Sequence, residues 1–414
     1  MYLASVERPA GAVADRTRRI AGNVLALGAV SLVTDVSSEM VSSVLPLYLV
    51  VGLGLGPVVY GVVDGLYTGA TALLRLVGGY VADRVRRRKL VAGLGYGISA
   101  VAKLGLLAAG TSVPGIGAAI VADRAGKGLR TAPRDALITL SAPAGSLGRA
   151  FGVHRAMDTA GAFAGPLVAL AVLAASGQAF DAVFVTSACV GAIGVLVLVL
   201  FVRDRRGPER QANAVDLRAA AALLRLAPVR SLLFGAALLG LSTIGDGFVY
   251  LLLSRRESLA TGWFPLLAVG TSLVYLLFAV PLGVLADRVG RAPVFLGGYA
   301  ALLAVYLLLA LSWGGTGALV TILFLYGLFY AATDGVLMAL AGPFLPPELR
   351  TTGLALIQSG QALAYLVSSV LFGLAWHWWD AAGAIRAAAV AAALTLAASA
   401  VFLLRPRRPE AGTT

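Results

Sequence analysis

Charged residues and cysteine are both scarce in this chain. Only 13% of its 414 residues are charged and 59% are hydrophobic, whereas a soluble domain carries about 25% charged residues. A single cysteine, Cys189, excludes an internal disulfide and a cysteine-based metal site. The two histidines show no metal-ligand spacing, and no phosphate-binding loop of an ATP-driven pump is present. We therefore expect no metal and no cofactor, and a bilayer in place of water around most of the chain.

The apolar residues gather in runs that are long enough to cross a membrane. A spanning helix needs about 20 apolar residues, and its backbone hydrogen bonds close within the segment. The sequence therefore predicts an all-α membrane protein with twelve transmembrane helices. The predicted spans are 23–51, 57–80, 90–109, 114–138, 149–175, 181–202, 229–253, 262–286, 293–312, 316–340, 350–375 and 382–404.

The basic residues lie mainly in alternate loops, which sets the expected orientation. By the positive-inside rule this asymmetry predicts a multi-pass protein of the cell inner membrane with both termini cytoplasmic. Arg255 and Arg256 fall on the other side and are the exception. We read the net charge of +13 as a topology signal, and we expect no nucleic-acid partner. The expected divisions are a tail 1–22, a six-helix bundle 23–202, a linker 203–228, a six-helix bundle 229–404 and a tail 405–414.

Several polar motifs occur twice, about 200 residues apart. A Gly-x-x-x-Asp-Arg motif follows the second and the eighth predicted span; its residues are Gly79, Asp83 and Arg84, and then Gly283, Asp287 and Arg288. Two further acidic pairs share this offset: Asp35 with Asp246, and Asp135 with Asp334. Internal duplication is typical of secondary transporters, in which the solute site lies between the repeats near the membrane midplane. The two bundles are thus expected to be pseudo-symmetric.

These motifs resemble those of the major facilitator superfamily over nearly the whole chain. The repeated Gly-x-x-x-Asp-Arg motif is similar to the family's loop signature, and Arg124 to Gly128 is similar to its Arg-x-x-x-Gly motif, whose arginine is linked to proton coupling. Gly161, Gly165 and Pro166 resemble a helix-packing motif of exporters that exchange a solute for protons. The run 126–138 resembles a prokaryotic subgroup that indicates no substrate. The resemblance implies the major facilitator fold and a monomeric, proton-coupled drug or solute antiporter.

Ionised side chains inside the predicted spans are the candidate functional residues. Each costs at least about 2.5–3.5 kcal/mol in a bilayer, so it faces a wet cavity or an opposite charge. Burial disfavours the charged form of a carboxyl group, which suits Asp35 or Glu39 to proton exchange, although a static ion pair of Asp35 is the alternative. The predicted solute and proton-coupling residues are Asp35, Glu39, Asp123, Arg124, Lys127, Asp158 and Asp246. The predicted conformational gate comprises Gly79, Asp83, Arg84, Arg134, Asp135, Gly283, Asp287, Arg288 and Asp334.

Two structural readings stay open beside these roles. Arg124, Lys127, Arg130 and Arg134 form one helical stripe, so they either line a cavity or pair with carboxylates. His154 lies one turn from the membrane surface, where we expect a structural hydrogen bond.

The combined evidence favours a secondary transporter that exports a small amphipathic solute in exchange for protons. The alternatives are an importer of a small anionic solute, a passive channel and, in another class, a polytopic membrane enzyme. A lipid bilayer, a small-molecule solute and protons are the expected partners.

Overall fold

The computed structural model describes residues 22–404 except 86, 143–146, 205–222, 312 and 346–349. The side chains of residues 72, 73, 75–85, 148, 342, 350–352 and 355 are also outside the described part. Residues 1–21 of the predicted N-terminal tail, most of the predicted linker and the tail 405–414 therefore lie outside the described residues.

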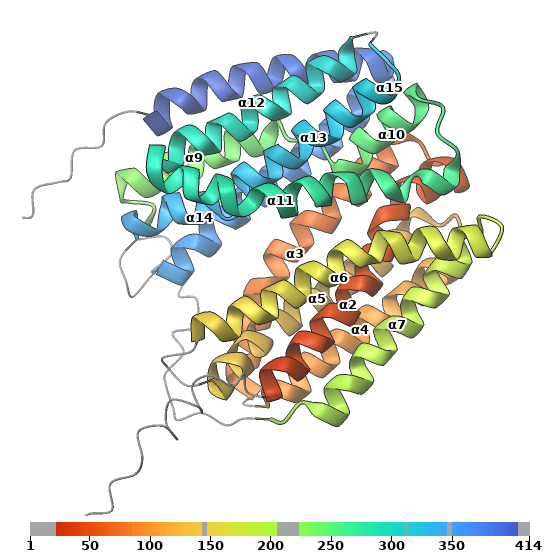
Figure 1. The fold of residues 1–414 in the computed structure, drawn as a ribbon, viewed down its shortest axis with the longest axis vertical. Coiled ribbons are helices and arrows are strands. Elements are labelled where there is room, and N and C mark those ends of the chain that lie inside the picture. The colour runs from red at the N-terminus through yellow and green to blue at the C-terminus, as the bar shows by residue number, and fades with distance from the viewer. Residues whose placement is uncertain are drawn as a thin grey trace, which may run out of the picture.

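Regular structure within the described residues is helical throughout. The first half of the chain forms α2 (Gly22–Leu47), which continues as a π-helical turn (Tyr48–Gly52), α3 (Pro57–Val85), α4 (Arg88–Ala109), α5 (Val113–Ser141), α6 (Leu147–Ala175) and α7 (Phe180–Phe201). The second half forms α9 (Ala227–Leu241), α10 (Asp246–Arg256), α11 (Pro265–Val289), α12 (Arg291–Ala310), α13 (Thr316–Thr333), α14 (Val336–Ala341) and α15 (Arg350–Leu404). Helices α2–α7 lie together in one group and α9–α15 in another, with α3 passing close to the second group (Figure 1).

Nine helical stretches within the described residues are long and apolar enough to span a membrane. One of them, Leu356–Leu404, contains a break at Asp380, where φ is 70° and ψ is 179°. Helices α3 and α5 have 29 residues each but are not among the nine. Ten of the predicted spans lie almost entirely within continuous helical structure, whereas 229–253 and 316–340 are each divided over two helices. The total of twelve stays a prediction.

The loops gather at two ends of the molecule. At one end Phe180 packs against Gly52, and the backbone N–H of Gly315 donates to Glu257 Oε2 at 2.8 Å. At the other end the Asn23 side chain donates to Ser141 Oγ at 2.7 Å. We call the first the closed end (residues 53–56, 110–112, 176–179, 257–264 and 311–315) and the second the open end (residues 87, 142, 202–204, 290 and 342–345).

The two halves meet tightly near the closed end. A Cβ placed on Gly61 of α3 would come within 2.5 Å of the carbonyl oxygen of Ser369 in α15. A Cβ placed on Gly373 would come equally near the carbonyl oxygen of Pro57. Glycine thus lets the two backbones approach to contact, as small residues do between membrane helices.

Arg255 and Arg256, the exception to the loop charge rule, make structural contacts at the closed end. Arg256 Nη1 donates to the carbonyl of Leu308 at 2.8 Å, and its Nε lies 3.7 Å from Glu257 Oε1. The Arg255 guanidinium lies 5.1 Å from the centre of the Trp376 ring. These contacts account for arginine on the side that the positive-inside rule disfavours.

Helix α6 packs against α2 through Gly161 and Gly165. Gly161 faces the backbone of Leu32, and a Cβ on Gly165 would come within 2.6 Å of Glu39 Cβ. Pro166 follows inside α6 and reaches the central cavity described below. The close contact leaves no room for a Cβ at Gly161 or Gly165, and the packing role of this motif stays a prediction.

We predict that Gly161→Ala lowers the apparent melting temperature of the purified protein, because the added Cβ collides with the Leu32 backbone and overpacking costs about 1–3 kcal/mol. Gly152→Ala on the same helix is the matched control, since a Cβ there meets no atom within 4 Å. Alanine favours a helix over glycine by about 1 kcal/mol, so the control is expected to hold or raise the melting temperature. Equal melting temperatures for the two variants would contradict the packing role.

Candidate functional site

A cavity of about 810 Å³ lies between the two halves. Helices α2, α3, α5 and α6 line one wall, and α9–α15 line the other. Arg155 lies on the open-end side of the lining, and 68% of its side chain is exposed, whereas the glycine contacts between α3 and α15 shut the closed end. The cavity is therefore reached from the open end, and its volume is that of a small-molecule site.

The wall from the first half carries fixed charges. Glu39, Arg124, Lys127 and Asp158 of the predicted set line it. Glu39 accepts a hydrogen bond from Ser42 Oγ at 2.6 Å, one turn along α2. Of the four, Glu39 and Lys127 have no ion-pair partner within 4 Å among the described residues. Lys127 is the cation of the two. Its ammonium group can therefore take up an anionic group from a solute.

Arg124 is a buried cation that is already paired. Its guanidinium bonds to Asp123 through Nε at 2.9 Å and through Nη2, and stacks 3.7 Å from the centre of the Tyr67 ring. Asp123 also accepts from Ser99 and lies 3.9 Å from Lys103 Nζ. Asp123 is absent from the cavity lining, whereas Arg124 is part of it. Asp123 therefore lies behind the wall, where it neutralises and orients Arg124.

Asp35 lies outside the cavity lining and next to Arg130. The closest atoms of the two charged groups are 3.7 Å apart, and both residues are buried. The structure thus has the geometry of the static ion pair, and a coupling role of Asp35 stays a prediction. One turn away Ser31 bonds to His154 Nε2 at 2.9 Å, which confirms the structural hydrogen bond expected of that histidine.

Arg134, Asp135 and Asp158 form a chain of charges towards the open end. Arg134 Nε donates to Asp135 at 3.0 Å, and its Nη1 lies 3.9 Å from Asp158. Asp158 alone of the three lines the cavity, where it also accepts from Arg155. Three of the four cations of the α5 stripe are therefore paired with carboxylates, and Lys127 faces the cavity.

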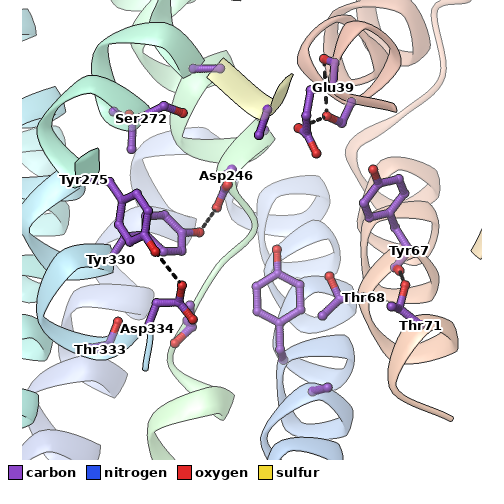
Figure 2. Close-up of a pocket in the computed structure, with 18 of the residues that line it drawn as sticks. Glu39, Tyr67, Thr68, Thr71, Asp246, Ser272, Tyr275, Tyr330, Thr333 and Asp334 are labelled. Carbon is purple, nitrogen blue, oxygen red and sulfur yellow. Dashed lines mark hydrogen bonds between the residues drawn. The ribbon is translucent and has the colours of Figure 1, made fainter. Parts of the chain in front are cut away.

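The wall from the second half is rich in tyrosine. None of these tyrosines is among the site residues predicted from the sequence. Asp246 at the start of α10 accepts hydrogen bonds from Tyr326 at 2.7 Å and from Tyr330. Asp334 at the end of α13 accepts from Tyr275 at 2.9 Å. Figure 2 shows Glu39 and Tyr67 on one side of the cavity and Asp246, Tyr330, Tyr275 and Asp334 on the other. Tyr326 and Tyr330 are four residues apart on one helix, a spacing that could have marked them.

Six of the nine predicted gate residues belong to the two copies of the Gly-x-x-x-Asp-Arg motif. The backbone of α3 includes Gly79, Asp83 and Arg84, but their side chains lie outside the described residues. Near the open end Asp287 pairs with Arg291 at 3.3 Å, and Arg291 donates to the carbonyl of Ala339 at 2.6 Å. Gly283 and Arg288 lie on the same last turns of α11. Contacts between α12 and α14 are thus present at the second copy of the motif, and its gating role stays a prediction.

Asp64 of α3 joins the two halves, although the sequence marks it only as one charge among several in the spans. Its carboxylate accepts from Ser369 Oγ at 2.6 Å and Tyr365 Oη at 3.0 Å, both on α15. Tyr60, one turn earlier on α3, donates to its other oxygen at 3.3 Å. Asp64 also lines the cavity.

Comparison with known proteins identifies the same architecture. A family model for the Major Facilitator Superfamily matches residues 27–270 and 257–414. An uncharacterised MFS-type transporter from Methanocaldococcus jannaschii is 32% identical over 374 residues, covering 87% of this chain and 90% of the relative. An uncharacterised Mycobacterium tuberculosis protein is 36% identical over 157 residues, 38% of each chain.

Solved transporters share the fold. The nucleoside transporter NupG superposes with a TM-score of 0.77 at 16% identity, covering 93% of this chain and 100% of that one. A D-xylose-proton symporter gives 0.69 at 18% identity, covering 93% and 96%. A POT family peptide transporter gives 0.74 at 15% identity, covering 95% and 98%.

We predict that Asp123→Asn destabilises the protein by about 3 kcal/mol, because it leaves the Arg124 guanidinium buried without its counterion. Asp135→Asn on the same helix is the matched control: its partner is also the preceding arginine, but 43% of the Asp135 side chain is exposed against 13% for Asp123. An exposed pair contributes at most about 1 kcal/mol. Denaturation of the two variants in detergent measures the difference, and equal losses would refute the neutralising role of Asp123.

Proposed function

The chain belongs to the Major Facilitator Superfamily, and from this premise we propose that it exports a small amphipathic solute in exchange for protons. The family consists of membrane transporters, not enzymes, so a polytopic membrane enzyme is no longer a candidate. The proposal concerns the coupling ion, the direction and the class of solute. A cavity that is lined by uncompensated carboxyl groups from both halves is the observation that carries it.

Glu39 and Asp246 supply the proposed proton sites. They come from opposite halves, and neither has a Lys or Arg partner within 4 Å among the described residues. The side chains that donate hydrogen bonds to them carry uncharged hydroxyl groups: Ser42 for Glu39, and Tyr326 and Tyr330 for Asp246. Because no cation among the described residues neutralises these carboxyl groups, they are the groups that we propose to exchange protons with the cavity, which opens to water.

The composition of the cavity wall supports an amphipathic solute. Aromatic rings of Tyr250, Phe329 and Tyr330 offer apolar faces, and the two tyrosine hydroxyl groups together with Thr271 and Gln358 offer polar contacts. Rings of this kind stack on flat apolar groups, while the polar atoms fix orientation. A solute with one apolar face and a few polar groups matches this wall.

We propose that α3, α5 and the two parts of α15 complete a set of twelve spans. Helix α5 can cross lipid despite its charges because Arg124 and Arg130 are each only 3% exposed. With the Arg-rich loops in the cytoplasm, the open end is cytoplasmic and the structure is the inward-open state of an alternating-access cycle. A D-xylose-proton symporter with the same fold supports proton coupling as a property this fold can carry.

A second candidate function is the import of a small anionic solute. Lys127 favours it, because its ammonium group faces the cavity without an ion-pair partner among the described residues. Arg124 lies one turn away on the same wall. Direction of transport separates this candidate from export.

We predict that an uncoupler raises the steady-state content of the solute in cells that express the protein. A thermal-shift screen on the purified protein first identifies the solute. Glu39→Gln and Asp246→Asn are expected to abolish transport driven by a pH gradient in proteoliposomes, whereas Asp181→Asn at the start of α7, outside the cavity, is the control. Uncoupler-sensitive accumulation inside the cell would instead establish import.

We predict that Lys127→Gln weakens the binding of anionic ligands by about tenfold, the factor that corresponds to about 1.4 kcal/mol, and leaves that of uncharged ligands unchanged. Titration calorimetry on the purified protein measures both. Equal loss for charged and uncharged ligands would mean that Lys127 shapes the cavity and does not recognise a charge.

A further inference from the structure

Two hydrogen bonds join the halves near the closed end, and both end on one atom. Tyr365 and Ser369 of α15 donate to Oδ2 of Asp64 in α3. The two donors are four residues apart on one face of α15. A single carboxylate oxygen therefore holds α15 against α3 at the blind end of the cavity.

The surroundings of this carboxylate come from three helices. Gly245, at the break between α9 and α10, lies so close that a Cβ there would meet the Asp64 carboxylate. The titratable groups that face Asp64 are Tyr60 of α3, Tyr365 of α15 and Asp246 of α10. No Lys or Arg lies within 4 Å of it among the described residues. Hydroxyl donors and the first turn of α10, where a negative charge is favoured, compensate the carboxylate in place of a cation.

Shape complementarity surrounds the polar contact. Gly61 and Gly65 of α3 lie against the backbone of α15 at Ser369 and Leu366. This packing holds the helices close together, but it involves no group that can take up a proton. Asp64 is the point in this interface at which a change of charge in the cavity can act.

We infer that Asp64 couples the cavity to the closed end. It acts as a latch that holds α3 and α15 together while its carboxylate carries no proton and no bound solute. Opening of this end requires both hydrogen bonds to break. A proton on Oδ2, or a hydrogen-bond donor of a bound solute, takes one of the two lone pairs that accept from Tyr365 and Ser369. One of the two hydrogen bonds is then lost, and protonation also removes the charge that strengthens the other. Either event weakens the latch. The inference rests on the proposed alternating-access function and adds the residue that links occupancy to conformation.

The other cavity carboxyl groups lack this geometry. Glu39 accepts from Ser42 of its own helix, and Asp246 accepts from Tyr326 and Tyr330 of its own half. Removing their charge alters the cavity without freeing one half from the other. The control for Asp64→Asn is Asp181→Asn, which removes a carboxylate outside the cavity.

Spin-label distances at the two ends test the latch. Cys189→Ser supplies the background, and labels at Val51→Cys and Trp379→Cys report on the closed end, while Leu90→Cys and Val289→Cys report on the open end; all four positions are exposed. We expect Asp64→Asn at fixed pH to raise the ratio of separated to closed conformers at the closed end about tenfold, the factor for one charge-assisted hydrogen bond. The open-end distance is expected to shorten in the same sample.

Two further measurements keep the outcomes distinct. Tyr365→Phe combined with Ser369→Ala removes the donors and leaves the carboxyl group, so it is expected to open the closed end as Asp64→Asn does. In the wild type, acid is expected to separate the closed-end labels, and Asp64→Asn is expected to abolish this response while Asp181→Asn, outside the cavity, keeps it.

The two proposals fail separately. If the wild type responds to pH and both the Asp64→Asn and the donor variants match it at every pH, the latch is wrong and proton-coupled transport stands. If Asp64→Asn opens the closed end but the wild type shows no response to pH and no proton-driven transport, the latch stands and proton coupling is wrong.

Discussion

The cost of a charge in lipid governs the arrangement of this protein. An ionised side chain in a membrane helix must meet water or an opposite charge, and α5 contains six such side chains along 29 residues. Arg124 and Arg130 solve the problem by pairing with Asp123 and Asp35. The side of α5 that carries these paired arginines is buried inside the protein, where α5 packs against α2, α3 and α4. The position of Lys127 on the cavity wall follows, because it lies between the two paired arginines on the same stripe.

Hydropathy and spacing predicted the helices well because they depend on local sequence. Most predicted spans coincide with single helices, and the spacing of its cations predicts the charged stripe of α5 without knowledge of their partners. The partners could not be predicted in the same way. Whether Asp35 met Arg130 or the cavity depends on how α2 and α5 rotate against each other. The hydrogen bonds of Asp64 could not be predicted for the same reason, since its donors lie about 300 residues away on α15.

Breaks in the helices were a second feature that the sequence pattern concealed. The segment 229–253 reads as one continuous span, but α9 ends at Leu241 and α10 begins at Asp246. Helix α13 likewise ends before Asp334, where Gly335 has φ of 79°. Asp246 and Asp334, the two acids of the second half that line the cavity, therefore lie at helix ends. Transporters of other folds also use discontinuous helices near the midplane to hold solutes and ions, and hydropathy averages over such short interruptions.

The two halves consequently contribute different chemistry to one cavity. In the first half most buried charges neutralise one another, and Lys127 on the cavity wall has no ion-pair partner among the described residues. The second half presents carboxyl groups that are held by hydroxyl donors, which a proton or a solute can replace at small cost in free energy. Glycine contacts close the far end through shape, and shape alone gives no response to cargo. A carboxylate placed where both halves and the cavity meet supplies that response, because its hydrogen bonds across the interface compete directly with whatever binds in the cavity.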